Sequence, residues 1–325
     1  MNYKKSRYGL SKKGFEMSFA WLFAIIVGSA ILILAVYFAV KLINTEQNGV
    51  NTQTAKEFAN LFDPLQTSVE ESKVAAPLEL MTETQVYTSC NPSGEFGTNI
   101  IRLAERSTFG DKNFTKPGEE ISVNNQYIFS ENKIQGKKFY FFIKSFNMPF
   151  KIADLMIVYS EKYCFVSPPA LLNTEIGNLG GESHNIIIKD SVNGCGNAVT
   201  VCFNGEKCNI NVICSTDDCE SCVVKKENKE IYFINSLIYS AIFSSYDNYR
   251  CNVQRIAKRL SHLSELYADK ARFVSGKGCE TGLYGDMVVL KEAAESYSKL
   301  EDLTQIDGLA REIKIKNDNL ICQLF

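Results

Sequence analysis

The sequence predicts an α+β protein with an N-terminal transmembrane helix, a β-rich middle that contains disulfides, and a helical C-terminal hairpin or bundle. An uncharged run, a stretch of alternating apolar and polar residues, and a late stretch with apolar residues every three or four positions lead to this prediction. The expected parts are a cytoplasmic basic tail over 1–16, a transmembrane helix over 17–42, a stalk or linker over 43–75, a β-rich ectodomain over 76–234 and a helical subdomain over 235–325.

The transmembrane prediction rests on the uncharged run from Met17 to Val40. As a helix it is roughly 36 Å long, whereas about 30 Å spans the hydrocarbon core. A secretory signal has an apolar region of only about 7 to 15 residues, so an uncleaved anchor is expected, and a buried core helix is the alternative. Five basic residues precede the run, which predicts a cytoplasmic N-terminus and a single pass through the plasma membrane. The lipid bilayer is thus the first expected partner.

Small residues recur along this run at Ala20, Ala24 and Gly28. This spacing lets a second helix approach closely in lipid, so self-association through the helix is a hypothesis. The alternative is that these residues contact only lipid, because alanine and glycine are common in membrane helices.

The residues K-K-G-F at 12–15 resemble the leaders of archaeal and bacterial type IV pilin-like proteins. The resemblance implies cleavage between Gly14 and Phe15, which leaves the helix as an assembly stalk. Phe19 stands where the family usually has a glutamate, and Glu16 stands where archaeal leaders prefer a small or apolar residue. The whole layout is also similar to uncharacterised archaeal membrane-anchored proteins, and this similarity implies no activity.

Composition narrows the class of protein. The chain has 325 residues, 45% of them apolar, a net charge of −2 and scattered lysines, so no basic surface for nucleic acid is expected. All eleven cysteines follow residue 89, which favours an oxidising, extracytoplasmic compartment. The two histidines, His184 and His262, limit histidine catalysis to two candidates.

The membrane helix is expected to continue as an amphipathic stalk, because Phe58, Phe62 and Leu65 are spaced four and three apart with Leu61 beside them. Pro64 is expected to bend or end it. Beyond the stalk, the pattern predicts a strand over 78–88, a hairpin around Gly136, one strand over 153–166, a glycine loop over 176–183, and hairpins over 199–213 and 223–234.

The cysteines are interpreted mainly as structural disulfides. Cys202 and Cys208 flank an Asn-Gly turn, and the loop length decides whether they face each other. A zinc site at Cys208, Cys214, Cys219 and Cys222, or a redox pair at the last two, are weaker alternatives, because only one C-x-x-C is present and no helix follows it. Since the number of cysteines is odd, at least one is left over, as a buried thiol or a link to another chain. The disulfide candidates are Cys90, Cys164, Cys195, Cys202, Cys208, Cys214, Cys219, Cys222, Cys251, Cys279 and Cys322.

The C-terminal part begins with a long helix, capped by Asp247 or Asn248 and ended by Gly276 and Gly278. Its apolar seam is Tyr249, Val253, Ile256, Leu260, Leu263, Tyr267, Ala271 and Val274, and its solvated face is expected to be Arg255, Lys258, Arg259, Glu265 and Asp269. Two more helices follow, around 290–297 and 306–313, with a turn near Asp302.

Helix length restricts the pairing of the last three cysteines. Cys251 and Cys279 lie at opposite ends of the long helix, roughly 33 Å apart, so they cannot bond to each other. Cys322 therefore pairs with Cys251 if the last helices form one kinked rod, or with Cys279 if they fold back. The first arrangement is slightly favoured.

No catalytic constellation is evident. Ser183-His184 and His262 are interpreted as ordinary polar residues, Asp217, Asp218 and Glu220 as a solvated turn, and Asn113-Phe114-Thr115 as a weak glycosylation sequon. The sequence predicts no cofactor. It favours a non-enzymatic, membrane-anchored protein in surface structure or recognition, with pilin-like assembly as a variant. A membrane-tethered hydrolase or thiol oxidoreductase, or a ligand-binding ectodomain, are the alternatives.

Overall fold

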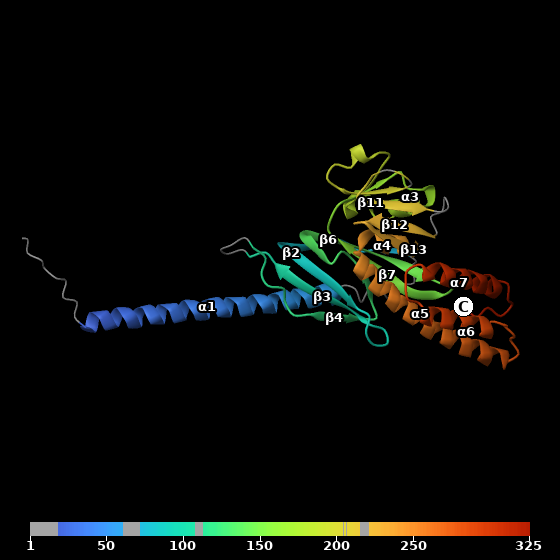
Figure 1. Ribbon diagram of the computed structural model, residues 1–325, viewed down its shortest axis with the longest axis horizontal. Coiled ribbons are helices and arrows are strands. Elements are labelled where there is room, and N and C mark those ends of the chain that lie inside the picture. The colour runs from blue at the N-terminus through green and yellow to red at the C-terminus, as the bar shows by residue number, and fades with distance from the viewer. Residues whose placement is uncertain (1–18, 61–71, 108–112, 204, 206, 215–220) are drawn as a thin grey trace, which may run out of the picture. The chain divides into compact units, whose positions relative to one another are not determined.

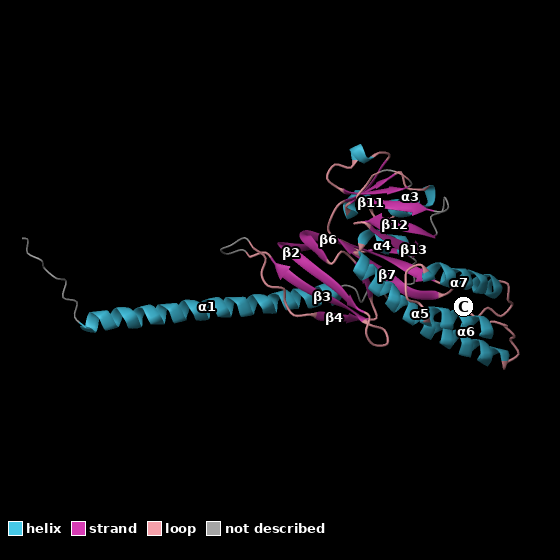
Figure 2. Ribbon diagram, viewed as in Figure 1, coloured by secondary structure: helices cyan, strands magenta, loops and turns pink. Residues whose placement is uncertain are grey.

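The computed structural model describes residues 19–60, 72–107, 113–203, 205, 207–214 and 221–325 (Figure 1). The chain divides into two compact units, one up to Gln47 and one from Asn48 onward. The predicted α+β class is confirmed, with an N-terminal apolar helix, two β-sheets with several disulfides, and C-terminal helices (Figure 2).

Helix α1 runs without interruption over Phe19–Asn60. The side chains of residues 19–42 are exposed, and this stretch is long and apolar enough to cross a membrane. Residues 48–60 belong to the folded unit, where Ala55 and Phe58 are buried. The prediction that the apolar helix continues past residue 42 is confirmed. Leu61, Phe62, Pro64 and Leu65 lie outside the described residues.

The first sheet has seven strands, in the order β4-β3-β2-β6-β7-β5, with β1 paired to β6. They are β1 Ser72–Val74, β2 Leu78–Asn91, β3 Thr98–Glu105, β4 Ile121–Asn124, β5 Tyr127–Phe129, β6 Lys133–Asn147 and β7 Lys151–Tyr159. β2 confirms the predicted strand. The hairpin expected around Gly136 is wrong, because β6 passes straight through it. Gly136 instead faces Thr84, where the β2–β6 register shifts, and a glycine inside a strand often marks such an irregularity.

The second sheet has the order β13-β12-β11-β10-β8-β9. Its strands are β8 Tyr163–Val166, β9 Ile186–Lys189, β10 Val199–Phe203, β11 Ile210–Cys214, β12 Ser221–Lys226 and β13 Lys229–Ile234. The single strand expected over 153–166 is therefore two strands, β7 and β8, which lie in different sheets. Two short 3-10 helices, Gly181–His184 and Val192–Gly194, lie between its strands.

One of the two hairpins expected in this sheet is wrong. β10 and β11 pair in parallel, with Cys202 opposite Asn211. The chain returns beside β10 because the Asn209 side chain accepts hydrogen bonds from the backbone N–H and the hydroxyl of Thr200, at 2.9 and 2.8 Å. The β12–β13 hairpin is confirmed, and its turn has positive φ at both Glu227 and Asn228, as a type I′ turn requires.

The helices of the folded unit are α3 Ala170–Gly177, α4 Leu237–Phe243, α5 Tyr246–Ser275, α6 Tyr284–Glu295 and α7 Asp302–Asp318. Ser245 caps α5 by accepting a hydrogen bond from Asn248 N, so the expected cap was two or three residues late. The predicted turn before α7 is confirmed. There, Asp302 Oδ2 accepts from the backbone N–H of Ser298 and of Lys299, at 2.9 and 3.0 Å.

The core combines both sheets with α4–α7. Tyr249, Val253, Ile256 and Leu260 of the predicted α5 seam are each at most 2% exposed and belong to one apolar cluster with strands of both sheets. A second cluster lies on the other side of the first sheet, where Ala55, Phe58 and Ala59 of α1 pack with residues of β2, β3 and β6. The face of α5 opposite its apolar seam is polar, and it contacts the end of β2.

Candidate functional site

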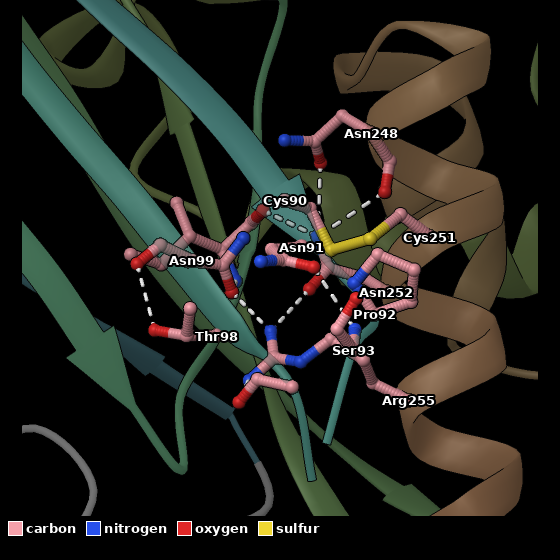
Figure 3. Close-up of a disulfide and its surroundings, with 12 residues drawn as sticks. Cys90, Asn91, Pro92, Ser93, Thr98, Asn99, Asn248, Cys251, Asn252 and Arg255 are labelled. Carbon is pink, nitrogen blue, oxygen red and sulfur yellow. Dashed lines mark hydrogen bonds between the residues drawn. A yellow bond between two sulfur atoms is a disulfide. The ribbon is translucent and has the colours of Figure 1, made fainter.

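The most elaborate polar arrangement in the described chain joins α5 to the end of β2 and the loop that follows it (Figure 3). A disulfide links Cys90 at the end of β2 to Cys251 in the second turn of α5, with a Cα–Cα distance of 6.0 Å. Arg255, Lys258 and His262 follow Cys251 at spacings of four, three and four residues, so all four lie on one helix face. We call this face the clamp.

Arg255 is the centre of the clamp. Its side chain is fully buried, and its guanidinium donates to Phe96 O at 2.9 Å, to Asn252 Oδ1 at 2.8 Å and to Asn99 Oδ1. The guanidinium also lies 4.8 Å from the centroid of the Tyr127 ring. Its acceptors are all neutral oxygens, so no carboxylate of the described residues directly compensates the buried charge.

The expectation that Arg255 lies on a solvated face is wrong. Arg255 lies on the face of α5 opposite the apolar seam, and this face is buried at Arg255 because the loop after β2 covers the helix there. Burial lowers the pKa of Arg255 to about 10, which still leaves it charged at neutral pH. The hydrogen bonds and the aromatic ring make this burial tolerable.

The rest of the clamp holds the loop itself. Lys258 Nζ donates to Pro92 O at 2.7 Å and to Gly94 O at 3.1 Å, and the His262 ring lies 5.1 Å from that of Phe96. Gly97 has φ of +60°, and a Cβ there would lie 2.5 Å from Asn91 O. A glycine is therefore needed for the chain to close over Arg255.

A cleft of about 350 Å³ lies beside this loop, and its lining includes Lys258, Ser261, His262 and Glu295. Ser261 Oγ donates to Glu295 Oε1 at 3.1 Å, and His262 Nε2 lies 3.9 Å from Glu95 Oε1. Ser261 therefore directs its proton to a carboxylate rather than to a histidine, and this geometry does not build a hydroxyl nucleophile.

The other histidine candidate has a structural contact on each ring nitrogen. His184 Nε2 lies 2.9 Å from Ala75 O, which can only accept, so this nitrogen carries the proton. Ser183 Oγ lies 2.9 Å from His184 Nδ1 and 2.6 Å from Gly180 O. A Cβ at Gly180 would lie 2.1 Å from the same Nδ1. The pair thus fixes a tight turn against β1.

The cysteines form disulfides across the folded unit. Cys90–Cys251, Cys164–Cys195, Cys202–Cys208 and Cys279–Cys322 are bonded, and Cys214 is disulfide-bonded as well. The preference for Cys251–Cys322 is wrong, because α6 and α7 fold back on each other and bring Cys322 to Cys279. The prediction that Cys251 and Cys279 do not bond to each other is confirmed.

The cysteines considered as zinc ligands do not form a cluster of thiolates in the described part of the chain. Cys208 and Cys214 are in disulfides, and Cys222 is buried in β12. Cys219 lies outside the described residues, as do Asp217, Asp218 and Glu220. The described part of the chain contains no group of three or more candidate ligands placed to hold a metal ion.

The structure places the remaining candidates without joining them into a site. Ala20, Ala24 and Gly28 are exposed on α1, and nothing lies within 4 Å of a Cβ built at Gly28. Asn113 is exposed, as glycosylation would require. Gly14 and Phe15 lie outside the described residues.

Sequence reasoning missed the clamp. A signal was present, since Cys251, Arg255, Lys258 and His262 repeat at helical spacing on the face opposite the apolar seam. Their partners come from residues 90–97, more than 150 positions earlier, and nothing local indicates that pairing.

Comparison with protein-family models, with curated proteins and with solved structures finds no match for this chain. The argument about function therefore rests on its own features. The N-terminal apolar helix and the several disulfides indicate a secreted or membrane-anchored extracytoplasmic protein.

Proposed function

We propose that this chain is a single-pass, membrane-anchored extracytoplasmic protein with a structural or recognition role at the cell surface. In this proposal the N-terminus is cytoplasmic, the disulfide-bonded unit lies outside the plasma membrane, and the N-terminal helix self-associates in a pilin-like manner. The continuity of α1 carries the proposal, because one helix contains both the exposed apolar stretch and residues of the core.

The packing of the second half of α1 supports a retained helix. Phe58 meets the rings of Phe139 and Phe141 edge-on, with centroids 5.9 and 5.5 Å away. Asn51 is 1% exposed and donates to Thr115 Oγ1 at 2.9 Å and to Lys116 O at 3.0 Å. The apolar stretch and these core residues belong to one uninterrupted helix, which fits a retained anchor that leads directly into the folded unit.

The length and exposure of the first half support a bilayer as its environment. Residues 19–42 form 24 consecutive helical residues with exposed apolar side chains, roughly 36 Å in length. Exposing this apolar surface to water costs free energy, whereas a hydrocarbon layer of about 30 Å would cover nearly all of it. No comparable observation on the described residues supports the enzymatic alternative, because the side chains of Ser183 and His184 both make structural contacts.

The mass of the protein isolated from membranes tests the proposal. Cells that express the full chain are fractionated, the membranes are washed with alkaline carbonate, and the intact mass is measured after reduction. We expect the protein in the washed membranes with a chain that begins at Phe15. A membrane-bound chain that begins near Met1 contradicts the pilin-like part alone. A soluble chain that begins after Leu42 contradicts the anchor.

Self-association is tested by changing the small-residue face. Ala24→Leu adds bulk at the centre of the Ala20–Gly28 stripe, and Ile33→Leu changes an exposed apolar residue elsewhere on the helix without adding volume. We expect Ala24→Leu to reduce chemical crosslinking between full-length chains in membranes and Ile33→Leu to leave it unchanged. Equal crosslinking in both variants contradicts a role for the stripe.

A further inference from the structure

The sequence contains one acceptor motif for an N-linked glycan, Asn113-Phe114-Thr115. Asn91 and Ser93 have the same spacing, but the proline between them excludes that pair. Three residues alone are a weak signal, because so short a pattern often occurs by chance. The structure adds the environments of the asparagine and of the threonine, and these two environments differ.

The side chain of Asn113 is exposed, and it makes no hydrogen bond with the described residues. Its backbone is held, because Asn113 O accepts from Ser107 N at 3.0 Å. The next residue, Phe114, pairs with Arg106 in an isolated antiparallel bridge, and the Arg106 guanidinium lies 5.9 Å from the centroid of the Phe114 ring. A glycan on the Asn113 amide would therefore extend into solvent without breaking a contact of the described residues.

The hydroxyl of Thr115 is fully engaged in the folded protein. Thr115 Oγ1 donates to Glu105 O at 3.0 Å and accepts from Asn51 Nδ2 at 2.9 Å. Asn51 belongs to α1 and is 1% exposed. Because a hydroxyl has a single proton, and Thr115 gives its proton to Glu105, the folded protein does not offer this group to an enzyme that recognises the motif.

The two environments are compatible with glycosylation in one order of events. The motif requires the hydroxyl at its third position, and Thr115 offers it only before residues 113–116 dock on α1. Asn113 remains exposed after docking, so a glycan that was added earlier does not prevent folding. The disulfides of the folded unit indicate an extracytoplasmic compartment, which is where such motifs are modified.

We propose that Asn113 carries an N-linked glycan, which is attached before Thr115 docks on α1. The donor is an oligosaccharide linked through a phosphate to a lipid. Asn113 Nδ2 forms a bond to the anomeric carbon of the sugar, the bond from this carbon to the phosphate oxygen breaks, and the lipid phosphate leaves and takes up the amide proton. This assignment rests on the proposed function, which places the folded unit outside the cytoplasm, but not on pilin-like assembly.

Peptide mass mapping of the full-length protein, isolated from the membranes of cells that produce it naturally, tests the site. We expect the peptide that contains Asn113 to be heavier than its sequence by a whole number of sugar residues. The Asn113→Gln variant from the same cells should lose this mass increase. Asn124→Gln changes an exposed asparagine of β4 outside the motif and should keep it. An unmodified Asn113, or a mass increase that persists in Asn113→Gln, overturns the proposal.

Two changes at Thr115 test whether its hydroxyl is required. Thr115→Ser keeps the hydroxyl and should keep the glycan, whereas Thr115→Val keeps the shape of the side chain without the hydroxyl and should lose the glycan. A glycan that persists in Thr115→Val overturns the proposal. Thr115→Val also removes two hydrogen bonds of the folded protein, so Asn113→Gln, on an exposed residue, keeps the test decisive if Thr115→Val does not fold.

The order of events is tested with unmodified full-length protein from a host that has no such transferase. The folded chain, and the same chain after reduction and unfolding, are each incubated with membranes that contain the transferase and its lipid-linked donor. We expect only the unfolded chain to gain the glycan at Asn113, because only there is the Thr115 hydroxyl available. Equal modification of the folded chain contradicts the proposed order.

Protease digestion of sealed membrane vesicles of known orientation separates a failure of this site from a failure of the proposed function. If the folded unit lies on the extracytoplasmic side and Asn113 is unmodified, the glycan alone is wrong and the anchor stands. If the folded unit lies on the cytoplasmic side, both the glycan and the proposed function are wrong.

Discussion

The buried guanidinium of Arg255 leads to a counterintuitive prediction, namely that a new buried carboxylate stabilises the protein. Asn99 is 1% exposed, and its Oδ1 already accepts from Arg255 and from Ile128 N, the latter at 3.2 Å. Its Nδ2 has no partner among the described residues. Asn99→Asp therefore sacrifices no existing hydrogen bond and supplies the carboxylate that Arg255 lacks (Figure 3).

The expected gain follows from the pKa of Arg255. The lowering of this pKa from its usual range to about 10 corresponds to about 3 kcal/mol of unfavourable burial for the charged form. A carboxylate in contact recovers part of this, but its own desolvation consumes some of the gain. We expect Asn99→Asp to raise the free energy of unfolding at pH 7 by about 1–2 kcal/mol, or the melting temperature by about 4 °C.

The assay is thermal and urea unfolding of the full-length protein in detergent, followed by circular dichroism. The control is the double variant Asn99→Asp/Arg255→Met, in which the carboxylate is buried without a cation. It should be less stable than Arg255→Met alone by about 3–5 kcal/mol, so that the effect of the same substitution reverses its sign. The reasoning is refuted if Asn99→Asp destabilises the protein whether or not Arg255 is present.

Three further predictions concern stability. Phe58→Ala should lower the free energy of unfolding by about 3–5 kcal/mol because it empties a buried site in the second core, whereas the exposed neighbour change Lys56→Ala should alter it by less than about 0.5 kcal/mol. Gly118→Ala should cost about 1–3 kcal/mol, because its Cβ would lie 2.8 Å from Thr52 N, whereas Gly285→Ala, with nothing within 4 Å, should gain about 0.5 kcal/mol. The free energy of unfolding should also fall as pH rises above 10. Burial raises the pKa of several tyrosines in the folded protein, so that above pH 10 the tyrosines of the unfolded chain ionise while the buried ones do not. These buried residues are Tyr159, Tyr163, Tyr239 and Tyr249.

Each of these three has a clear contrary outcome. Equal effects of Phe58→Ala and Lys56→Ala would mean that residues 48–60 do not contribute to the core. A stable Gly118→Ala variant would show that the segment beside α1 tolerates a side chain. Urea unfolding between pH 8 and 11.5 checks the tyrosines, and a free energy of unfolding that is flat or rising above pH 10 contradicts their burial.

The sequence predicts those parts of the fold that repeat along the chain. Periodicity over thirty residues was enough to place α5 and its apolar seam, and the long uncharged run was enough to place α1. Local turn signals were less dependable. The Asn-Gly pair at 204–205 is a common hairpin signal, but the side chain of Asn209 binds Thr200 and sets β11 parallel to β10.

The clamp could not be predicted in the same way. The burial of Arg255 depends on Phe96 and Asn99, which lie 159 and 156 positions earlier in the chain. On the helix alone, Arg255 is one more charged residue beside Lys258 and Arg259, and a solvated face is the ordinary interpretation.

The course of α1 also determines how a soluble form of the protein should be cut. A fragment that starts at residue 76 keeps every strand of the first sheet except β1 but discards Ala55, Phe58 and Ala59, and so leaves the apolar surface around Phe139 and Phe141 bare. Such a fragment is expected to aggregate on expression. A fragment that starts between Leu42 and Asn48 sheds the apolar stretch and keeps the core, which makes it the appropriate material for crystallisation or for raising antibodies.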